Sequence, residues 1–173
     1  MSDETHAARI DDLRAAFDHA SGRFLARYDT TTDLEAVAVP PTGGWTAAQI
    51  AAHVAALNRV LSAIVSGRID RATPPPGEFV ERPWSDIATG LTGRLEAPAS
   101  LTAPPTVMRV EAREAFEASR RLVLETFAAI DETRARHVFT DPRTGTISLY
   151  QIGDWLTAHV VRHNVQLKAL LGR

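Results

Sequence analysis

Three histidines on two segments of the chain have the residue type and spacing of a metal site. His159 and His163 lie four residues apart in "HVVRH", and His53 lies in the apolar stretch "IAAHVAALNRVL". Side chains four residues apart project from the same face of a helix, so one ion can bind both rings while a facing helix supplies a third ligand. Three neutral imidazoles suit Zn, Ni or Fe and leave a coordination position for water or substrate. These residues therefore predict a mononuclear metal site.

A second interpretation of the same histidines stays open, because a buried imidazole can also serve only as a hydrogen-bonding residue of the core. Two other metal motifs are excluded. A zincin needs Glu directly after the first His, and a di-iron bundle needs Glu three residues before each ligand His. Val160 stands at the first of these positions, and Ile50, Leu156 and Val160 stand at the others.

The remaining candidates for chemistry are weaker. His6 lies near the terminus, His19 lies off the apolar stripe of its segment, and His137 lies in a link, so we expect all three at the surface. Asp154, five residues before His159, is a weak candidate for a general base and is expected to be exposed near the start of its helix. No catalytic residue and no cofactor-binding residue is assigned from the sequence.

Four segments with helical periodicity must position the ligands. They cover about residues 5–28, 47–66, 107–130 and 149–171. The second and fourth, which carry the histidines, begin alike. Thr46 and Ser148 are placed as N-caps, and Gln49 and Gln151, three residues later, complete capping boxes. The two ligand-bearing helices therefore have well-defined starts.

Each segment has an apolar stripe that is expected to face a common core. The stripes are Ile10, Leu13, Phe17, Phe24 and Leu25; Ile50, Val54, Leu57, Leu61 and Ile64; Val110, Phe116, Leu122 or Val123, and Phe127; and Ile152, Leu156, Val160, Leu167 and Leu170. The histidines of the predicted site fall within the second and fourth stripes, so we expect their rings to point inward.

A long connection over residues 68–106 separates the second segment from the third, with a short helix expected from Trp84 to Leu95. Such a crossover lets the second and third helices lie parallel. No strand run of convincing length is present. We predict an all-α fold, one domain over residues 1–173, as a four-helix bundle in up-down-down-up order with the second and fourth helices adjacent.

The same connection has two possible roles. It is either a rigid strap packed on the bundle or the roof of a ligand pocket. In the second case Phe79, Arg82, Trp84 and Arg94 would meet an anionic or aromatic substrate.

Composition narrows the function classes. With 45% hydrophobic and 23% charged residues the chain is globular, and its net charge of -2 gives no reason to expect nucleic acid or an anionic membrane as partner. The N-terminus lacks the apolar region of a secretory signal, and no apolar run approaches the ~18 residues of a membrane span, so we expect a cytoplasmic protein. The absence of cysteine excludes thiolate ligands and a protein thiol nucleophile.

The segments "WTAAQIAAH" and "HVVRHNVQ" resemble the DinB-like superfamily of bacterial four-helix bundles, which includes bacillithiol- and mycothiol-dependent transferases. The family pattern is Trp then Thr or Ser at the start of helix two, a His two turns later, and H-x-x-x-H-x-x-Q on helix four. The similarity covers the helical frame of nearly the whole chain, but its specific part is these two segments. It implies His53, His159 and His163 as ligands of Zn or Ni, and it matches Trp45 and Gln166 to the family's opening Trp and trailing Gln.

The resemblance also implies a chemistry, in which the metal lowers the pKa of a bound thiol or water. Because the chain has no cysteine, a thiol must come from a small cosubstrate. A His at position 159 resembles the pattern of the DinB and bacillithiol branch, whereas the Arg-rich, Lys-poor composition favours mycothiol-using bacteria. Both thiols therefore remain candidates for the cosubstrate. The expected function is transfer of a low-molecular-weight thiol to a small electrophile. The alternatives are a metal-dependent hydrolase and a non-enzymatic metal- or ligand-binding stress-response protein, and a homodimer is compatible with each.

Overall fold

Helices make up most of the chain in this computed structural model, which describes residues 5–41, 43–89 and 101–172. The long helices are α1 (His6–Tyr28), α3 (Ala47–Val65), α5 (Arg109–Ala129) and α7 (Leu149–Leu171). The connections hold the short helices α2 (Asp33–Val37), α4 (Trp84–Thr89) and α6 (Glu132–Ala135) and the strands β1 (Val138–Asp141) and β2 (Gly145–Ser148). The mainly helical class predicted from the sequence is confirmed.

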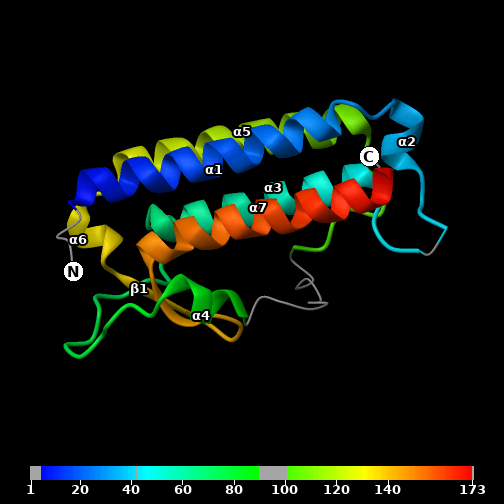
Figure 1. The fold of residues 1–173 in the computed structure, drawn as a ribbon. Coiled ribbons are helices and arrows are strands. Elements are labelled where there is room, and N and C mark those ends of the chain that lie inside the picture. The colour runs from blue at the N-terminus through cyan, green and yellow to red at the C-terminus, as the bar shows by residue number, and fades with distance from the viewer. Residues whose placement is uncertain (1–4, 42, 90–100, 173) are drawn as a thin grey trace.

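The four long helices lie side by side (Figure 1), with α3 packed most extensively on α5 and α1 on α7, and with further contacts of α3 with α7 and of α1 with α5. The ligand-bearing helices α3 and α7 are therefore neighbours, as predicted. Gln49 at the start of α3 bonds to the carbonyls of Pro104 and Pro105, which precede α5. Arg134, which follows α5, donates to the carbonyl of Ile64 near the end of α3 at 2.8 Å. α3 and α5 thus begin at the same end of the molecule.

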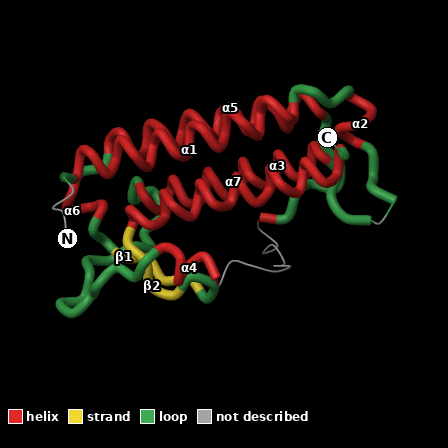
Figure 2. Tube along the Cα trace, viewed as in Figure 1, coloured by secondary structure: helices red, strands yellow, loops and turns green. Residues whose placement is uncertain are grey.

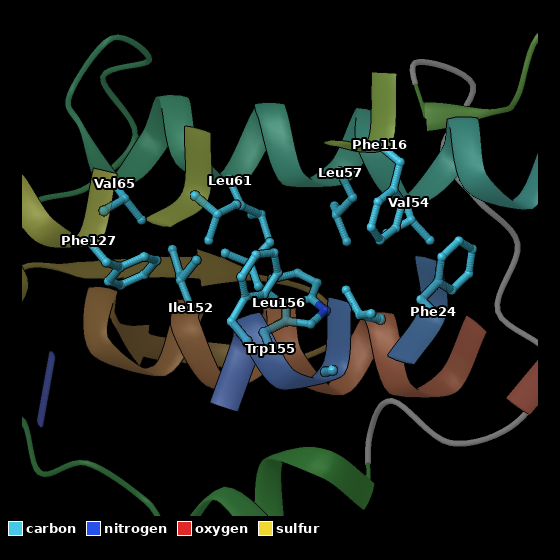
Figure 3. Packing of buried hydrophobic residues seen from close by; sticks show 14 of the residues in the cluster. Phe24, Val54, Leu57, Leu61, Val65, Phe116, Phe127, Ile152, Trp155 and Leu156 are labelled. Atoms are coloured by element: carbon cyan, nitrogen blue, oxygen red, sulfur yellow. The ribbon is translucent and has the colours of Figure 1, made fainter. Parts of the chain in front are cut away.

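Apolar side chains from the four long helices fill the space between these helices (Figure 3). Phe24 of α1 and Phe116 of α5 are fully buried and stack with ring centroids 4.6 Å apart. The stripes predicted for α1 and α3 are all buried, and so is that of α7 except for Leu170, which is partly buried. These side chains hold the two ligand-bearing helices against each other.

The stripe predicted for α5 was wrong at one residue. Val110 is 56% exposed, and the buried residue at that end of the helix is Ala112. Val110 is six residues before Phe116, which places it about 240° around the helix from Phe116 and off the core face. Ala112 is four residues before Phe116 and lies on that face. Of the two alternatives further along, Val123 is buried in the core and Leu122 is only partly buried.

Capping boxes open both ligand-bearing helices, as predicted. The hydroxyl of Thr46 accepts from the backbone N–H of Gln49 at 3.2 Å, and the Gln49 side chain accepts from the N–H of Thr46 at 3.0 Å. Ser148 and Gln151 make the same reciprocal pair, with both distances 3.3 Å. A cap of this kind contributes about 1 kcal/mol, so it helps to determine where each ligand-bearing helix begins.

A β-hairpin occupies the link before α7, where the sequence predicted no strand (Figure 2). β1 and β2 pair antiparallel, with Val138 opposite Ser148 and Asp141 opposite Gly145. Gly145 has a φ of 69°, a left-handed conformation that glycine adopts without strain. The strands are four residues each, too short for a clear alternating pattern, and so they escape recognition by periodicity.

The crossover from α3 to α5 contains α4, which begins at the predicted Trp84 and ends at Thr89. The rest of the helix that we expected as far as Leu95 lies outside the described residues. Before α4, Thr73 forms an isolated bridge with Val138 of β1. The carbonyl of Arg82 accepts from the Gln151 side chain at 2.8 Å. The crossover is therefore attached to the hairpin and to the start of α7.

One helix of the described residues, α3, is long and apolar enough to cross a membrane by length and composition alone. However, 67% of its most apolar window is buried inside the structure, against the other long helices. The core helix of a soluble protein passes the same test, so α3 is only weak evidence for a membrane span.

Candidate metal centre

The three histidines of the predicted site meet between α3 and α7. The Nε2 atom of His159 lies 3.1 Å from Nε2 of His53 and 3.1 Å from Nε2 of His163. One ligand atom from each ring lies within 4.8 Å of the others, so the cluster is compact enough to hold one metal ion. The two α7 rings meet because they are four residues apart on one helix face. His53 faces them because α3 packs on α7.

Two of the rings are held in a defined tautomer by hydrogen bonds on the side away from the cluster. Nδ1 of His53 lies 2.7 Å from the carbonyl oxygen of Leu101, and Nδ1 of His163 lies 2.8 Å from Oε1 of Gln166. Both partners can only accept, so each Nδ1 must carry the proton. The neutral rings therefore direct an unprotonated Nε2 into the cluster. Metal-binding histidines almost always have such an outer hydrogen bond.

Burial keeps the three imidazoles neutral. Desolvation first, and the neighbouring His53 second, lower the pKa of His163 to about 4. Burial, followed by the two neighbouring rings, holds the pKa of His159 well below its usual 6.5. Burial also lowers the pKa of His53, although the hydrogen bond to Leu101 acts in the opposite direction. Near pH 7 all three rings are thus in the form that binds a metal ion.

The spacing of the nitrogens fits a small divalent cation. Zn bound at ~2.0–2.1 Å in tetrahedral geometry places its ligand nitrogens about 3.3 Å apart. The two measured separations of 3.1 Å are close to that value. Nδ1 of His159 is buried and has no hydrogen-bond partner among the described residues, so its tautomer, unlike that of the other two rings, is not determined by an outer contact.

The three rings of the cluster differ in exposure and in their distance from Trp45. His53 and His163 are only 6% and 7% exposed, while His159 is partly exposed. The indole of Trp45 lies 4.6 Å from the His53 ring and 6.4 Å from the His163 ring, between ring centroids. His159 is thus the most exposed ring of the cluster, and Trp45 packs near the other two.

The other histidines differ in part from expectation. His19 is exposed, as predicted. His6 and His137 are partly buried, and so less exposed than we expected. Nε2–H of His6 donates to the carbonyl of Ile130 at 3.1 Å, and the hydroxyl of Tyr150 donates to its Nδ1 at 2.7 Å. His6 thus joins the starts of α1 and α7 and takes no part in the cluster.

Asp154 was expected to be exposed, and this was wrong, because it is partly buried in α7. Asp154 is five residues before His159, which places it about 140° around the helix from His159. The carboxylate and the imidazole therefore project from different faces. This placement does not favour Asp154 as a general base for the cluster.

The residues suggested as a pocket roof are engaged in packing. Trp84 packs against the core, and Arg82 donates to the carbonyl of Thr144 in the hairpin. Phe79 is partly buried. Arg94 lies outside the described residues. These contacts favour the interpretation of this part of the crossover as a strap packed on the bundle.

Two contributors to the site were missed from the sequence. One is the backbone carbonyl of Leu101, which carries no residue-type signal and reaches His53 only through the fold. The other is the side-chain amide of Gln49, which holds the crossover in addition to its cap. The capping box predicted a contact only for the side-chain carbonyl oxygen of Gln49. The amide nitrogen, which the cap leaves without a role one helical turn before His53, could have indicated the second contact.

Comparison with known proteins places these residues in a family. The model of the DinB superfamily matches residues 16–167, a range that includes the three histidines of the cluster and Gln166. No curated protein matches the chain significantly.

Proposed function

The chain belongs to the DinB superfamily, and on that premise we propose that it is a metal-dependent enzyme that transfers a low-molecular-weight thiol to a small electrophile. His53, His159 and His163 would bind one divalent ion, Zn or Ni, through their Nε2 atoms. A catalytic metal with three protein ligands keeps a position for substrate, which a purely structural site does not need.

One observation carries this proposal: the three Nε2 atoms converge while the Nδ1–H groups of two of the rings are bonded outward. Hydrogen bonding within the cluster could satisfy only one of the two Nε2 atoms that face His159, because His159 has at most a single Nε2–H to donate. Here two Nε2 lone pairs point at a shared position, and the low pKa of each ring keeps those lone pairs free of protons near pH 7.

The chemistry divides between the ion and the protein. A bound divalent ion lowers the pKa of a thiol or a water molecule that it coordinates, so that a nucleophile exists at neutral pH. The protein residues hold and orient the metal ligands. Leu101 and Gln166 fix the directions of two ligand rings, and Trp45 packs near these rings. Because the chain has no cysteine, the thiol must be a cosubstrate.

The proposal also covers the order of the long helices, the location of the protein in the cell and the kind of partner it binds. The long helices follow the up-down-down-up order of a four-helix bundle, which is supported by the shared starting end of α3 and α5. The protein acts in the cytoplasm, which is compatible with the burial of α3, its most apolar long helix, inside the structure. Its partners are small molecules, neither nucleic acid nor membrane, because the net charge is only -2.

The experiment is a panel of bacterial thiols and electrophiles, assayed with Zn- or Ni-loaded protein and with chelator-treated protein. Conjugation that needs both thiol and metal, and that is lost in His53→Ala, supports the transferase. His19→Ala, on an exposed residue of α1, is the matched control and should keep full activity. Turnover without thiol would identify a hydrolase instead. No turnover across the panel, with metal bound, would assign the site to binding or stress response.

A further inference from the structure

The side chain of Gln49 contacts two different parts of the molecule. Its Oε1 accepts from the backbone N–H of Thr46 at 3.0 Å and so closes the capping box of α3. Its Nε2 donates to the carbonyl oxygens of Pro104 and Pro105 at 3.1 and 3.2 Å. A capping residue needs only the first contact, and Glu serves as well as Gln in that role. The second contact therefore needs an explanation of its own.

The two prolines belong to the segment that supplies the hydrogen-bond acceptor of His53. Leu101 lies three residues before Pro104, and its carbonyl accepts from Nδ1 of His53 at 2.7 Å. The side chains of Leu101 and Ala103 are buried, so packing holds this segment against the rest of the molecule. Side-chain packing does not by itself fix the direction of a backbone carbonyl. The contact with Gln49 holds the backbone of the same segment directly, three and four residues after Leu101, and so restricts the direction of the Leu101 carbonyl.

We infer that Gln49 is a positioning residue for the metal ligand His53. Its amide holds the crossover at Pro104 and Pro105, so that the Leu101 carbonyl keeps the His53 ring in the Nδ1–H tautomer with Nε2 turned to the cluster. Gln49 and His53 are four residues apart in α3, so the helix face that carries the ligand also carries the anchor of the ligand's hydrogen-bond acceptor. The effect of Gln49 on metal affinity rests on the proposed function, whereas its effect on the tautomer does not.

The other ligand-bearing helix offers a matched comparison. Gln151 has the same two roles at the start of α7, because its Oε1 accepts from the N–H of Ser148 and its Nε2 donates to the carbonyl of Arg82 at 2.8 Å. Within the described part of the chain, however, Arg82 supplies no hydrogen-bond acceptor to any ring of the cluster. Loss of the Gln151 amide should therefore release a part of the crossover without affecting a ligand.

The test uses Gln49→Met, which keeps the length and neutrality of the side chain and removes both of its contacts. Thr46→Ala is the control for the cap, because it removes the hydroxyl acceptor at the same helix start and leaves the Gln49 amide in place. Gln151→Met is the control for release of the crossover at α7. The readout is the tautomer of His53 in the metal-free protein, measured by ¹⁵N NMR of the labelled imidazoles.

We expect His53 to be in the Nδ1–H tautomer in the native chain and in both controls, and to be a mixture of tautomers in Gln49→Met. Affinity for Zn, measured by competition with a chelator, should fall about tenfold in Gln49→Met, as is usual when the outer partner of a metal ligand is lost. It should stay within about twofold in the controls. If Gln49→Met does not fold, Gln49→Glu keeps the cap acceptor without the amide donors, and the tautomer is measured in that variant.

Three results would overturn the role of Gln49. They are an unchanged tautomer in both Gln49 variants, an equal shift in Thr46→Ala, and a native His53 with the proton on Nε2. Failure of the proposed function gives a different pattern. If the native chain binds no metal while the tautomer still depends on Gln49, the metal site is refuted and the positioning of His53 is supported.

Discussion

The His53 ring and the Leu101 carbonyl are 48 residues apart in the chain and 2.7 Å apart in the structure. This hydrogen bond connects a ligand of the cluster on α3 to the crossover that leads to α5. It places a proton on Nδ1, which leaves Nε2 for the cluster. The crossover is therefore part of the site as well as a connection between helices.

The stability of the metal-free protein should depend on pH through the three imidazoles. Their pKa is lowered in the folded state, so between about pH 6.5 and pH 4 the unfolded chain binds more protons than the folded one. The free energy of unfolding should therefore be highest above about pH 6.5. It should decrease as the pH falls toward about 4, the pKa of His163 in the folded protein. Urea denaturation at several pH values measures this dependence.

The matched variant for this pH dependence is His163→Gln, which removes one of the titrating rings. Its free energy of unfolding should change less steeply across the same pH range. If the native protein were equally stable at about pH 7 and pH 5, the imidazoles could not be buried in neutral form, and the account of the site would need revision.

The two capping boxes should contribute measurably to stability. Thr46→Ala and Ser148→Ala each remove the side-chain acceptor of the first turn of a ligand-bearing helix, at a cost of about 1 kcal/mol. Thr106→Ala is the control, because Thr106 is exposed in the segment before α5 and should change stability by less than ~0.5 kcal/mol. Equal melting temperatures for all three variants and the native chain would argue against the assigned helix starts.

The corrected core face of α5 can be tested by a pair of substitutions. Phe116→Ala should destabilise the protein by roughly 3–5 kcal/mol, because it removes a fully buried ring that stacks on Phe24. Val110→Ala, on an exposed residue of the same helix, should change stability by no more than ~0.5 kcal/mol. Comparable losses in the two variants would restore the stripe expected from the sequence.

The long helices and the cluster were predictable because they follow from local regularities. Apolar residues repeat at helical spacing in each long helix, and the starts of α3 and α7 carry capping boxes that depend on residues only three apart. The pairing of His159 with His163 is likewise a matter of spacing within one helix. The approach of His53 followed from its place in an inward stripe, once α3 and α7 were taken as neighbours.

The features that escaped prediction depend on contacts between distant parts of the chain. The hairpin has strands of only four residues, and the crossover attaches to it through the bridge between Thr73 and Val138, which is a contact between distant parts of the chain. Val110 has the right residue type for the core, but its angle around α5 places it outside. The Leu101 carbonyl is a backbone group that every residue possesses, so only the fold identifies it as the partner of His53.

Metal content is the most direct measure of the central claim, that His53, His159 and His163 bind one divalent ion. Protein purified without an affinity tag should carry, or take up on titration with Zn or Ni, about one ion per chain. His53→Ala, His159→Ala and His163→Ala should each reduce that occupancy sharply, because two imidazoles hold such an ion far less tightly than three. His19→Ala should bind as the native chain does. Equal occupancy in all four variants, or no uptake by the native protein, would contradict the claim.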